Sequence, residues 1–392
     1  ERGTILTQVA EAKPAVNINE DYCSRCSICG SLCPYDAITR DHENDKIILD
    51  IEKCQVCGIC ASACPARAID TIYYDRDSLL NYLRKVKPNY KSDTLVVMCK
   101  GSAPDFSQVG KLFGVNDFVP LSVPCVGCIS EELLLAMLAE GMKKIDILAC
   151  DEDYCRFHRG SPLTGRRVMA LNRMLAQLGY GKDAITMKRN SLKVKVDKDL
   201  CIACGNCVFY CPYDAPKLES EGGISFDLDA CRGCGLCVSL CPAFALDLEN
   251  WERDRISSLL PKLIAEMKPP KVLVFRCQWA VYPPLNGDVS PNVRTIDLPC
   301  SGRIEAVHVL EALQNGADGV MVIACSEDDC KQEGVSAKAE HVVAKIKGQL
   351  EQIGLGERLG FGSVSPRYEG KAEEAILQFR QQIEAIGKKG KS

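Results

Sequence analysis

Cysteine is the residue type that points most clearly to chemistry in this sequence. The 392 residues include 25 cysteines, and sixteen of them fall into four copies of the pattern C-x2-C-x2-C-x3-C followed by proline. The four runs start at Cys23, Cys54, Cys201 and Cys231. No secretory leader opens the sequence, so we expect thiols that stay reduced and bind metal rather than form disulfides.

This spacing is the run of bacterial ferredoxins, in which three cysteines of one run and the fourth cysteine of its partner run hold each [4Fe-4S] cluster. Two-residue gaps let three thiolates surround one face of a cluster, and the longer gap turns the chain toward the neighbouring cluster. Structural zinc is the alternative, but zinc sites need no third two-residue step. The predicted ligand sets are Cys23, Cys26, Cys29 and Cys64; Cys54, Cys57, Cys60 and Cys33; Cys201, Cys204, Cys207 and Cys241; and Cys231, Cys234, Cys237 and Cys211.

Nine cysteines lie outside these runs, and eight of them form two equivalent sets. The first set is Cys99, Cys125, Cys150 and Cys155, and the second is Cys277, Cys300, Cys325 and Cys330. The offset between the sets is nearly the same as the offset between the ferredoxin runs, which predicts a tandem duplication of two modules. Four thiolates would suit one [2Fe-2S] cluster. Zinc and unmetallated thiols remain open from the spacing alone.

Short apolar runs precede the cysteines of the second module in each copy. Their β-branched residues are typical of buried strands, and they cover residues 94–97, 145–148, 271–275 and 320–323. Helical patterns over 131–140 and 304–313 are expected to end at Gly141 and Gly316. Alternating strands and helices predict a small α/β layer with a mostly parallel sheet, whose sites form beyond the carboxyl ends of the strands.

The predicted fold class is α+β and α/β multidomain, with two bacterial-type 2[4Fe-4S] ferredoxin modules alternating with two small α/β iron–sulfur modules. The expected divisions are an N-terminal extension (1–18), ferredoxin module 1 (19–74), α/β module 1 (75–190), ferredoxin module 2 (191–250) and α/β module 2 (251–392). The connection 277–293 is expected to be a loop, and a last helix is expected to end at Gly387. The sequence begins without methionine, so we expect a processed chain or the end of a longer polypeptide.

Several further residues allow two interpretations. Cys128 could be a spare ligand or a redox-active thiol, but a packed free cysteine is the more common case. His158 could bind iron as in Rieske-type centres, although four nearby cysteines favour a surface role. The acidic stretches 151–153 and 327–329, and the pair Arg166 and Arg167, are expected to be solvated.

The overall composition excludes some classes of protein. Lys and Arg total 48 against 52 for Asp and Glu, a formal charge of −4. That balance gives no support for nucleic-acid binding, and no apolar run is long enough to predict a membrane span. No G-x-G-x-x-G motif follows a strand, so no flavin or nicotinamide site is expected in this chain.

Residues 271–386 closely resemble the delta subunit of methyl-viologen-reducing hydrogenase. The resemblance is carried by 275–279 (Phe-Arg-Cys-Gln-Trp), 299–304 (Pro-Cys-Ser-Gly-Arg-Ile), 316–320 (Gly-Ala-Asp-Gly-Val), Cys325 and Cys330. That family often has one more cysteine where this chain has Ala280. Its members carry a [2Fe-2S] cluster and pass electrons to heterodisulfide reductase. The resemblance therefore implies [2Fe-2S] ligation by the second set of four cysteines, and the repeat extends this to the first set, which is more diverged.

The ferredoxin modules, including residues 15–20 before Cys23, look like the segment that follows the flavin domain in the A-type component of heterodisulfide reductase. This resemblance implies partners: a flavin-containing component of that kind and other redox subunits. We expect a cytoplasmic chain, alone or within a membrane-associated complex.

The main functional hypothesis is an electron-transfer subunit of a heterodisulfide reductase-like oxidoreductase, which relays electrons between a flavin-containing partner and another redox subunit. Such complexes can carry flavin-based bifurcation, but this chain would be only the electron path, with no catalytic residues of its own. One alternative is a protein that performs thiol or disulfide chemistry with the module containing Cys128. The other is a zinc-bearing scaffold.

Overall fold

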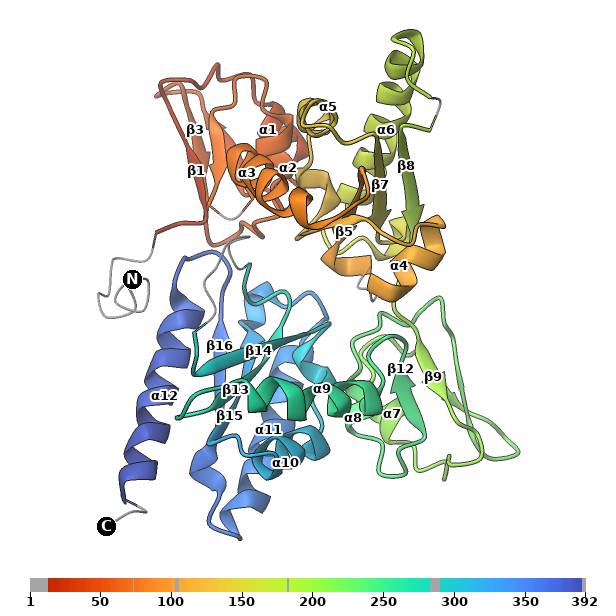
Figure 1. Ribbon diagram of the computed structural model, residues 1–392, viewed down its shortest axis with the longest axis vertical. Helices are drawn as coiled ribbons and strands as arrows, with labels where there is room; N and C mark the ends of the chain where they lie inside the picture. The colour runs from red at the N-terminus through yellow and green to blue at the C-terminus, as the bar shows by residue number, and fades with distance from the viewer. Residues whose placement is uncertain (1–12, 73, 103–105, 182, 283–289, 390–392) are drawn as a thin grey trace.

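The computed structural model describes residues 13–72, 74–102, 106–181, 183–282 and 290–389. Within these ranges the named strands form two four-stranded sheets and four two-stranded sheets. All pairings in the four-stranded sheets are parallel, and all pairings in the two-stranded sheets are antiparallel. The sheet types therefore agree with the predicted combination of α+β and α/β parts (Figure 1).

Each ferredoxin module consists of two antiparallel strand pairs and two short helices. In ferredoxin module 1 these are β1 (Val16–Ile18) with β4 (Ile69–Thr71), β2 (Ile38–Asp41) with β3 (Lys46–Leu49), α1 (Ile28–Leu32) and α2 (Ile59–Ala63). In ferredoxin module 2 they are β9 (Val194–Val196) with β12 (Leu246–Leu248), β10 (Pro216–Leu218) with β11 (Ile224–Phe226), α7 (Asn206–Tyr210) and α8 (Leu236–Ser239).

A residue with left-handed backbone precedes each of these short helices, between the second and third cysteines of a run. Glycine fills three of the four positions, including Gly58 at φ +74° and Gly235 at φ +77°, and Ser27 fills the fourth. Glycine adopts this conformation without a steric penalty. The resulting reversal lets closely spaced thiols face a common space.

The two α/β modules have the same strand order. In α/β module 1 the sheet runs β6-β5-β7-β8, formed by Val119–Val123, Thr94–Cys99, Lys144–Ala149 and Ile185–Arg189. In α/β module 2 it runs β14-β13-β15-β16, formed by Val293–Leu298, Val272–Cys277, Gly319–Cys325 and Leu359–Val364. The order reverses between the first and third strands, β5 and β7 or β13 and β15, and doubly wound sheets bind ligands at the carboxyl ends of such strands.

Helices pack around these sheets. In the first copy they are α3 (Arg76–Val86), α4 (Phe106–Phe113), α5 (Glu131–Ala139) and α6 (Gly160–Gln177). In the second copy they are α9 (Arg253–Ala265), α10 (Ala306–Gln314), α11 (Val335–Glu351) and α12 (Lys371–Lys389). No helix in the described ranges combines the length and the apolar composition that a membrane crossing requires.

The structure confirms the four predicted strand segments and both predicted helices, with small shifts at the ends. The helix expected over 304–313 begins at Ala306, after a 3-10 turn at Ser301–Arg303. The last helix continues through Gly387 to Lys389, so its expected end is wrong; one glycine in a helix costs only about 1 kcal/mol. Of the expected loop 277–293, residues 283–289 lie outside the described residues.

One buried histidine is expected to make the stability of α/β module 2 depend on pH. His308 on α10 has no exposed surface, and its Nδ1 has no hydrogen-bond partner within the described residues. Burial, assisted by the charge of Arg303, lowers the pKa of His308 from 6.5 to about 3. The unfolded chain therefore binds a proton, between these two pKa values, that the folded module does not bind.

We expect the free energy of unfolding to be highest above pH 6.5 and to fall by about 1.4 kcal/mol per pH unit below it, toward the folded pKa. The variant His308→Gln should lose this contribution. Urea denaturation of both proteins at pH 7, 6 and 5 measures it. Equal pH dependence in the two proteins would contradict the assignment.

Candidate iron–sulfur centres

The structure gathers the predicted ligands into six groups of four cysteines. Outer group 1 is Cys23, Cys26, Cys29 and Cys64; inner group 1 is Cys33, Cys54, Cys57 and Cys60; outer group 2 is Cys201, Cys204, Cys207 and Cys241; inner group 2 is Cys211, Cys231, Cys234 and Cys237. Sheet group 1 is Cys99, Cys125, Cys150 and Cys155; sheet group 2 is Cys277, Cys300, Cys325 and Cys330.

Each outer group lines a cavity, and the lining residues include the fourth cysteine of the partner run. Cys64 lines one cavity together with the three other members of outer group 1. Cys241 lines another with the members of outer group 2. Cys26 and Cys204 are exposed. The outer groups therefore lie at the protein surface.

The inner groups are more deeply buried and are also mixed between runs. Cys60 has Cys57, Cys54 and Cys33 as electrostatic neighbours, and Cys237 has the three other members of inner group 2. Burial raises the pKa of Cys54 to about 11 and that of Cys57 to about 12. Burial thus favours the neutral thiols, so we expect metal loading at the inner groups to release protons.

Backbone amides point at several of the ligand sulfurs. Val56 N donates to Cys54 Sγ at 3.4 Å, and Ala68 N donates to Cys64 Sγ at 3.3 Å. In sheet group 1, Gly127 N donates to Cys125 Sγ at 3.3 Å. Such hydrogen bonds stabilise the thiolate form and are among the factors that set cluster potentials.

The sheet groups occupy the switch point of each parallel sheet. Cys99 is the last residue of β5, and Cys150 directly follows the neighbouring strand β7. The thiol of Cys99 is hydrogen-bonded to those of Cys125 and Cys150, and Cys150 is bonded to Cys155. Four thiols from separate loops thus converge, as expected for ligands at the carboxyl ends of parallel strands.

Sheet group 2 has the same arrangement. The thiol of Cys277 is hydrogen-bonded to those of Cys300 and Cys325, and the thiol of Cys325 is hydrogen-bonded to that of Cys330. The hydrogen bond from Cys325, with help from two backbone amides, lowers the pKa of Cys330 to about 6. The equivalent bond from Cys150 lowers the pKa of Cys155 to about 7. In each sheet group this hydrogen bond therefore favours the thiolate, which is the form that binds metal.

These donor sets fit clusters. Among the described residues, no three His, Cys, Asp or Glu side chains converge tightly on one point as ligands of a single ion. Cluster ligands bind different iron atoms, so they need not meet at one point. All-cysteine sets of four sulfurs are the ligands of both [4Fe-4S] and [2Fe-2S] clusters.

The turn after the second cysteine of each sheet group packs on the neighbouring inner group. Cys128 lies so close to Gly58 that a Cβ on this glycine would stand 2.7 Å from Cys128 Cβ. In the other copy a Cβ on Gly235 would stand 2.7 Å from Arg303 Cδ. Only glycine fits at these two positions. The absence of a side chain there lets the inner group and the sheet group of one copy approach each other closely.

Cys128 itself has the properties of a packing residue. Its side chain is half-buried, and burial raises its pKa to about 12, with contributions from Cys99 and Cys57. The nucleophilic form of cysteine is the thiolate. The neutral thiol expected at this position therefore favours packing over thiol chemistry.

Two charged residues that were expected to be solvated are buried, and those predictions are wrong. Arg167 on α6 donates to Gly127 O at 3.0 Å, to Ile129 O at 2.8 Å and to Ser62 Oγ at 3.1 Å. It therefore fixes the Cys128 turn to α2 of ferredoxin module 1.

The second is Asp329, which is 1% exposed and ion-paired with Arg367 at 2.9 Å. Arg367 is distant from Asp329 in the sequence, so the residues around Asp329 do not predict this ion pair. His158, by contrast, is exposed, with its ring 5.8 Å from that of Tyr35. This placement agrees with the expected surface role.

The groups of one copy follow one another in space. Cys125 of sheet group 1 has Cys57 of inner group 1 as an electrostatic neighbour, and Cys300 of sheet group 2 has Cys234 of inner group 2. Tyr35 lies near both groups of the first copy, and burial with these thiols raises its pKa. Each copy therefore presents an outer, an inner and a sheet group in series.

Comparisons with known proteins agree with this architecture. Residues 96–196 and 272–387 match the family described as methyl-viologen-reducing hydrogenase, delta subunit. Residues 22–68 and 194–248 each match a 4Fe-4S dicluster domain. The fold and its cysteine groups thus define an iron–sulfur protein with two 4Fe-4S dicluster domains. The chain belongs to the family of the methyl-viologen-reducing hydrogenase delta subunit, which it matches in two separate regions.

Two kinds of relative are similar to different parts of the chain. The A-type component of ferredoxin:CoB-CoM heterodisulfide reductase from Methanosarcina mazei is 32% identical over 276 residues, covering 68% of this chain and 32% of that protein. The D-type iron-sulfur component of the F420-non-reducing hydrogenase from Archaeoglobus profundus is 30% identical over 131 residues, covering 32% of this chain and 96% of that protein. The chain spans about a third of the length of the heterodisulfide reductase relatives. Both resemblances predicted from the sequence are confirmed.

Proposed function

We propose that this chain is an iron–sulfur electron-transfer subunit of a heterodisulfide reductase-like oxidoreductase complex. It relays electrons between a flavin-containing partner and another redox subunit. The observation that carries the proposal is the packing of each inner group on the sheet-group turn of its own copy. Ser62 Oγ donates to Gly127 O at 2.7 Å in the first copy, and a Cβ on Gly235 would stand 2.7 Å from Arg303 Cδ in the second. Contiguous cysteine groups that run from the surface to the interior are what a path for electrons requires.

In this proposal the outer and inner groups hold four [4Fe-4S] clusters and the sheet groups hold [2Fe-2S] clusters. Such clusters accept and release one electron at a time, with potentials set by charge, burial and hydrogen bonding. The protein supplies the thiolates, the amide donors to sulfur and the exclusion of water. Where the complex performs flavin-based bifurcation, this chain contributes only the electron path.

Surface features support a role within a larger assembly. Around outer group 2, Ile202, Phe209 and Leu218 are exposed, with Phe209 at 80%. Clustered apolar side chains at a surface are typical of protein–protein interfaces. The names of the relatives, components of heterodisulfide reductases and hydrogenases, support partners of that kind for this chain.

The first experiment is anaerobic purification followed by iron and acid-labile sulfide analysis and redox-titrated EPR. We expect about 20 iron atoms per chain, with both cubane and [2Fe-2S] signals. The variant Cys128→Ser should keep the iron and the rate of electron relay from a reduced viologen, because Cys128 is not a ligand in this proposal.

Other results would contradict the proposed electron-transfer function. About 16 iron atoms together with bound zinc would indicate that the sheet groups are structural zinc sites. Zinc without iron would indicate that the whole chain is a zinc-bearing scaffold. Loss of turnover with retained relay in Cys128→Ser would favour the thiol-active alternative.

A further inference from the structure

The two copies contact each other as the halves of a twofold dimer do. Lys100 and Gln278 are equivalent residues, each directly after the first cysteine of a sheet group. Lys100 Nζ donates to Gln278 O at 2.8 Å, and Gln278 Nε2 donates to Lys100 O at 3.0 Å. A reciprocal contact between equivalent positions is the signature of a twofold interface. The pseudo-twofold axis therefore passes between the two sheet groups.

A second pair of equivalent contacts crosses between the copies. Gln55 directly follows Cys54 of inner group 1, and its Nε2 donates to Asp328 O at 3.4 Å. Its equivalent, Arg232, donates from Nη1 to Asp153 O at 3.3 Å. Asp328 and Asp153 lie between the last two cysteines of the sheet groups. Each inner group thus touches the sheet-group loop of the opposite copy, as the arrangement of the four modules in Figure 1 allows.

A basic residue lies at each of these two contacts between an inner group and the sheet-group loop of the opposite copy. Lys331, directly after Cys330, donates from Nζ to the side-chain oxygen of Gln55, and its ammonium lies 5.3 Å from the centre of the Phe157 ring. Both Cys325 of its own copy and Cys57 of the other are electrostatic neighbours of Lys331. The lysine is therefore placed between sheet group 2 and inner group 1.

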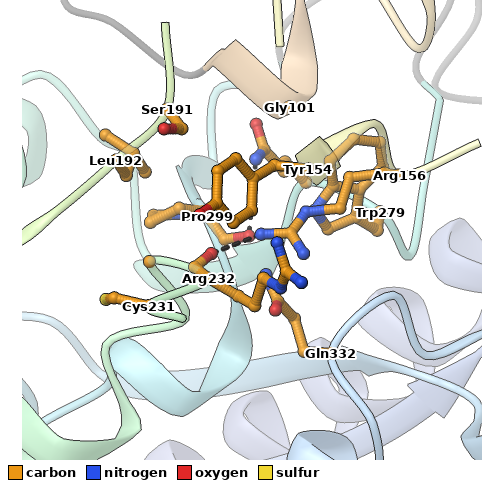
Figure 2. Close-up of a pocket in the computed structure, with 12 residues that line it drawn as sticks. Gly101, Tyr154, Arg156, Ser191, Leu192, Cys231, Arg232, Trp279, Pro299 and Gln332 are labelled. Carbon is orange, nitrogen blue, oxygen red and sulfur yellow. Dashed lines mark hydrogen bonds between the residues drawn. The ribbon is translucent and has the colours of Figure 1, made fainter. Parts of the chain in front are cut away.

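Arg156 occupies the equivalent position in the first copy, directly after Cys155. Its Nη2 donates to the backbone oxygen of Arg232, and Cys234 of inner group 2 is an electrostatic neighbour. Figure 2 shows this side chain reaching the Arg232 backbone between Tyr154 and Trp279. The aromatic rings of Tyr154 and Trp279 come from opposite copies.

These cations have an electrostatic consequence. A cluster held by four thiolates carries negative charge, and that charge grows when the cluster is reduced. A fixed positive charge nearby favours the reduced form, more strongly where water is excluded. Lys331 would thus favour an electron on inner group 1 as well as on sheet group 2, and Arg156 would favour one on inner group 2.

We propose that Lys331 and Arg156 are positioning residues that join each sheet group to the inner group of the opposite copy, so that electrons cross between the two halves of the chain. The inference rests on the proposed function. With clusters bound, each crossing would move one electron from the sheet-group centre of one half, which is oxidised, to the inner-group centre of the other, which is reduced, with no bond made or broken. The chain is then one connected path with two surface ends, at outer groups 1 and 2.

The test is a redox titration of the full chain followed by EPR. The variant Cys57→Ser first assigns the signal of inner group 1. In Lys331→Met, the reduced-to-oxidised ratio of that signal at a fixed potential should fall at least about threefold. Lys331→Arg should stay close to the wild type because it keeps the charge. Lys347 is an exposed lysine on α11, and Lys347→Met is the matched control that should leave this ratio unchanged.

Arg156→Met provides the equivalent test in the other half. It should lower the reduced-to-oxidised ratio of the inner group 2 signal and leave that of inner group 1 unchanged. Iron content equal to the wild type must accompany each comparison; if Lys331→Met loses iron, Lys331→Gln replaces it. Unchanged inner-group titrations with full iron, or shifts confined to the sheet group of the same copy, would overturn the crossing. Wild-type protein without iron would instead overturn the proposed function.

Discussion

Serine in place of Cys64 is expected to abolish the [4Fe-4S] signal of outer group 1 and to spare inner group 1. Cys64 belongs to the same run as three members of inner group 1, yet it lines the cavity formed by Cys23, Cys26 and Cys29. Serine oxygen is a harder donor than thiolate, and iron–sulfur sites select soft sulfur ligands. The expected loss is about four of about 20 iron atoms.

EPR of the reduced proteins distinguishes the two clusters, because the matched variant Cys33→Ser should have the opposite effect. Cys33 belongs to the first run but neighbours Cys60 of inner group 1. If Cys64→Ser removed the inner signal and kept the outer one, each run would hold its own cluster and the exchange of fourth cysteines would be wrong.

Replacing Arg303 with methionine is expected to lower the free energy of unfolding by about 3 kcal/mol. The Arg303 side chain has no exposed surface. It pairs with Glu305 and with Asp247, the latter at 3.0 Å, and donates to Trp251 O at 2.9 Å. Breaking a buried ion pair leaves an uncompensated charge, which typically costs about 3–5 kcal/mol. Arg253 still pairs with Glu305 at 2.7 Å, which places the cost at the lower end.

Anaerobic urea denaturation of the iron-loaded chain measures this loss. The double variant Arg303→Met with Glu305→Gln should recover none of it, because Glu305→Gln also removes the ion-pair partner of Arg253. The control is Lys338→Met, which removes an exposed contact to Tyr210 O between the same two modules and should cost less than about 1 kcal/mol. A similarly small loss in Arg303→Met would show that its ion pairs contribute little.

The comparison of Arg303 with Cys128 shows how the two copies have diverged at equivalent positions. Both residues pack on the left-handed glycine of an inner group. In the second copy the position carries a buried ionic network, and in the first copy Arg167 reaches the same turn from α6. Both copies therefore anchor the turn with an arginine, supplied from different places in the sequence.

The sequence by itself determined the cysteine groups, the duplication and the strands that end at ligands. These features are local, because ligand spacing within a run and apolar runs of a few residues depend only on neighbours along the chain. The repeat offset then related Cys99 to Cys277 without any knowledge of the fold.

The tertiary structure alone decided the order of the strands, the crossing contacts, the burial of Arg167 and Asp329, and the position of Lys331 between the copies. Each of these charged residues looks like a surface residue in its own segment, because its partner lies in another module or far along the chain: Ser62 for Arg167, Arg367 for Asp329 and Gln55 for Lys331. Such partners meet only when distant segments pack together. The free energy of a buried charge depends on that packing and not on the neighbouring sequence.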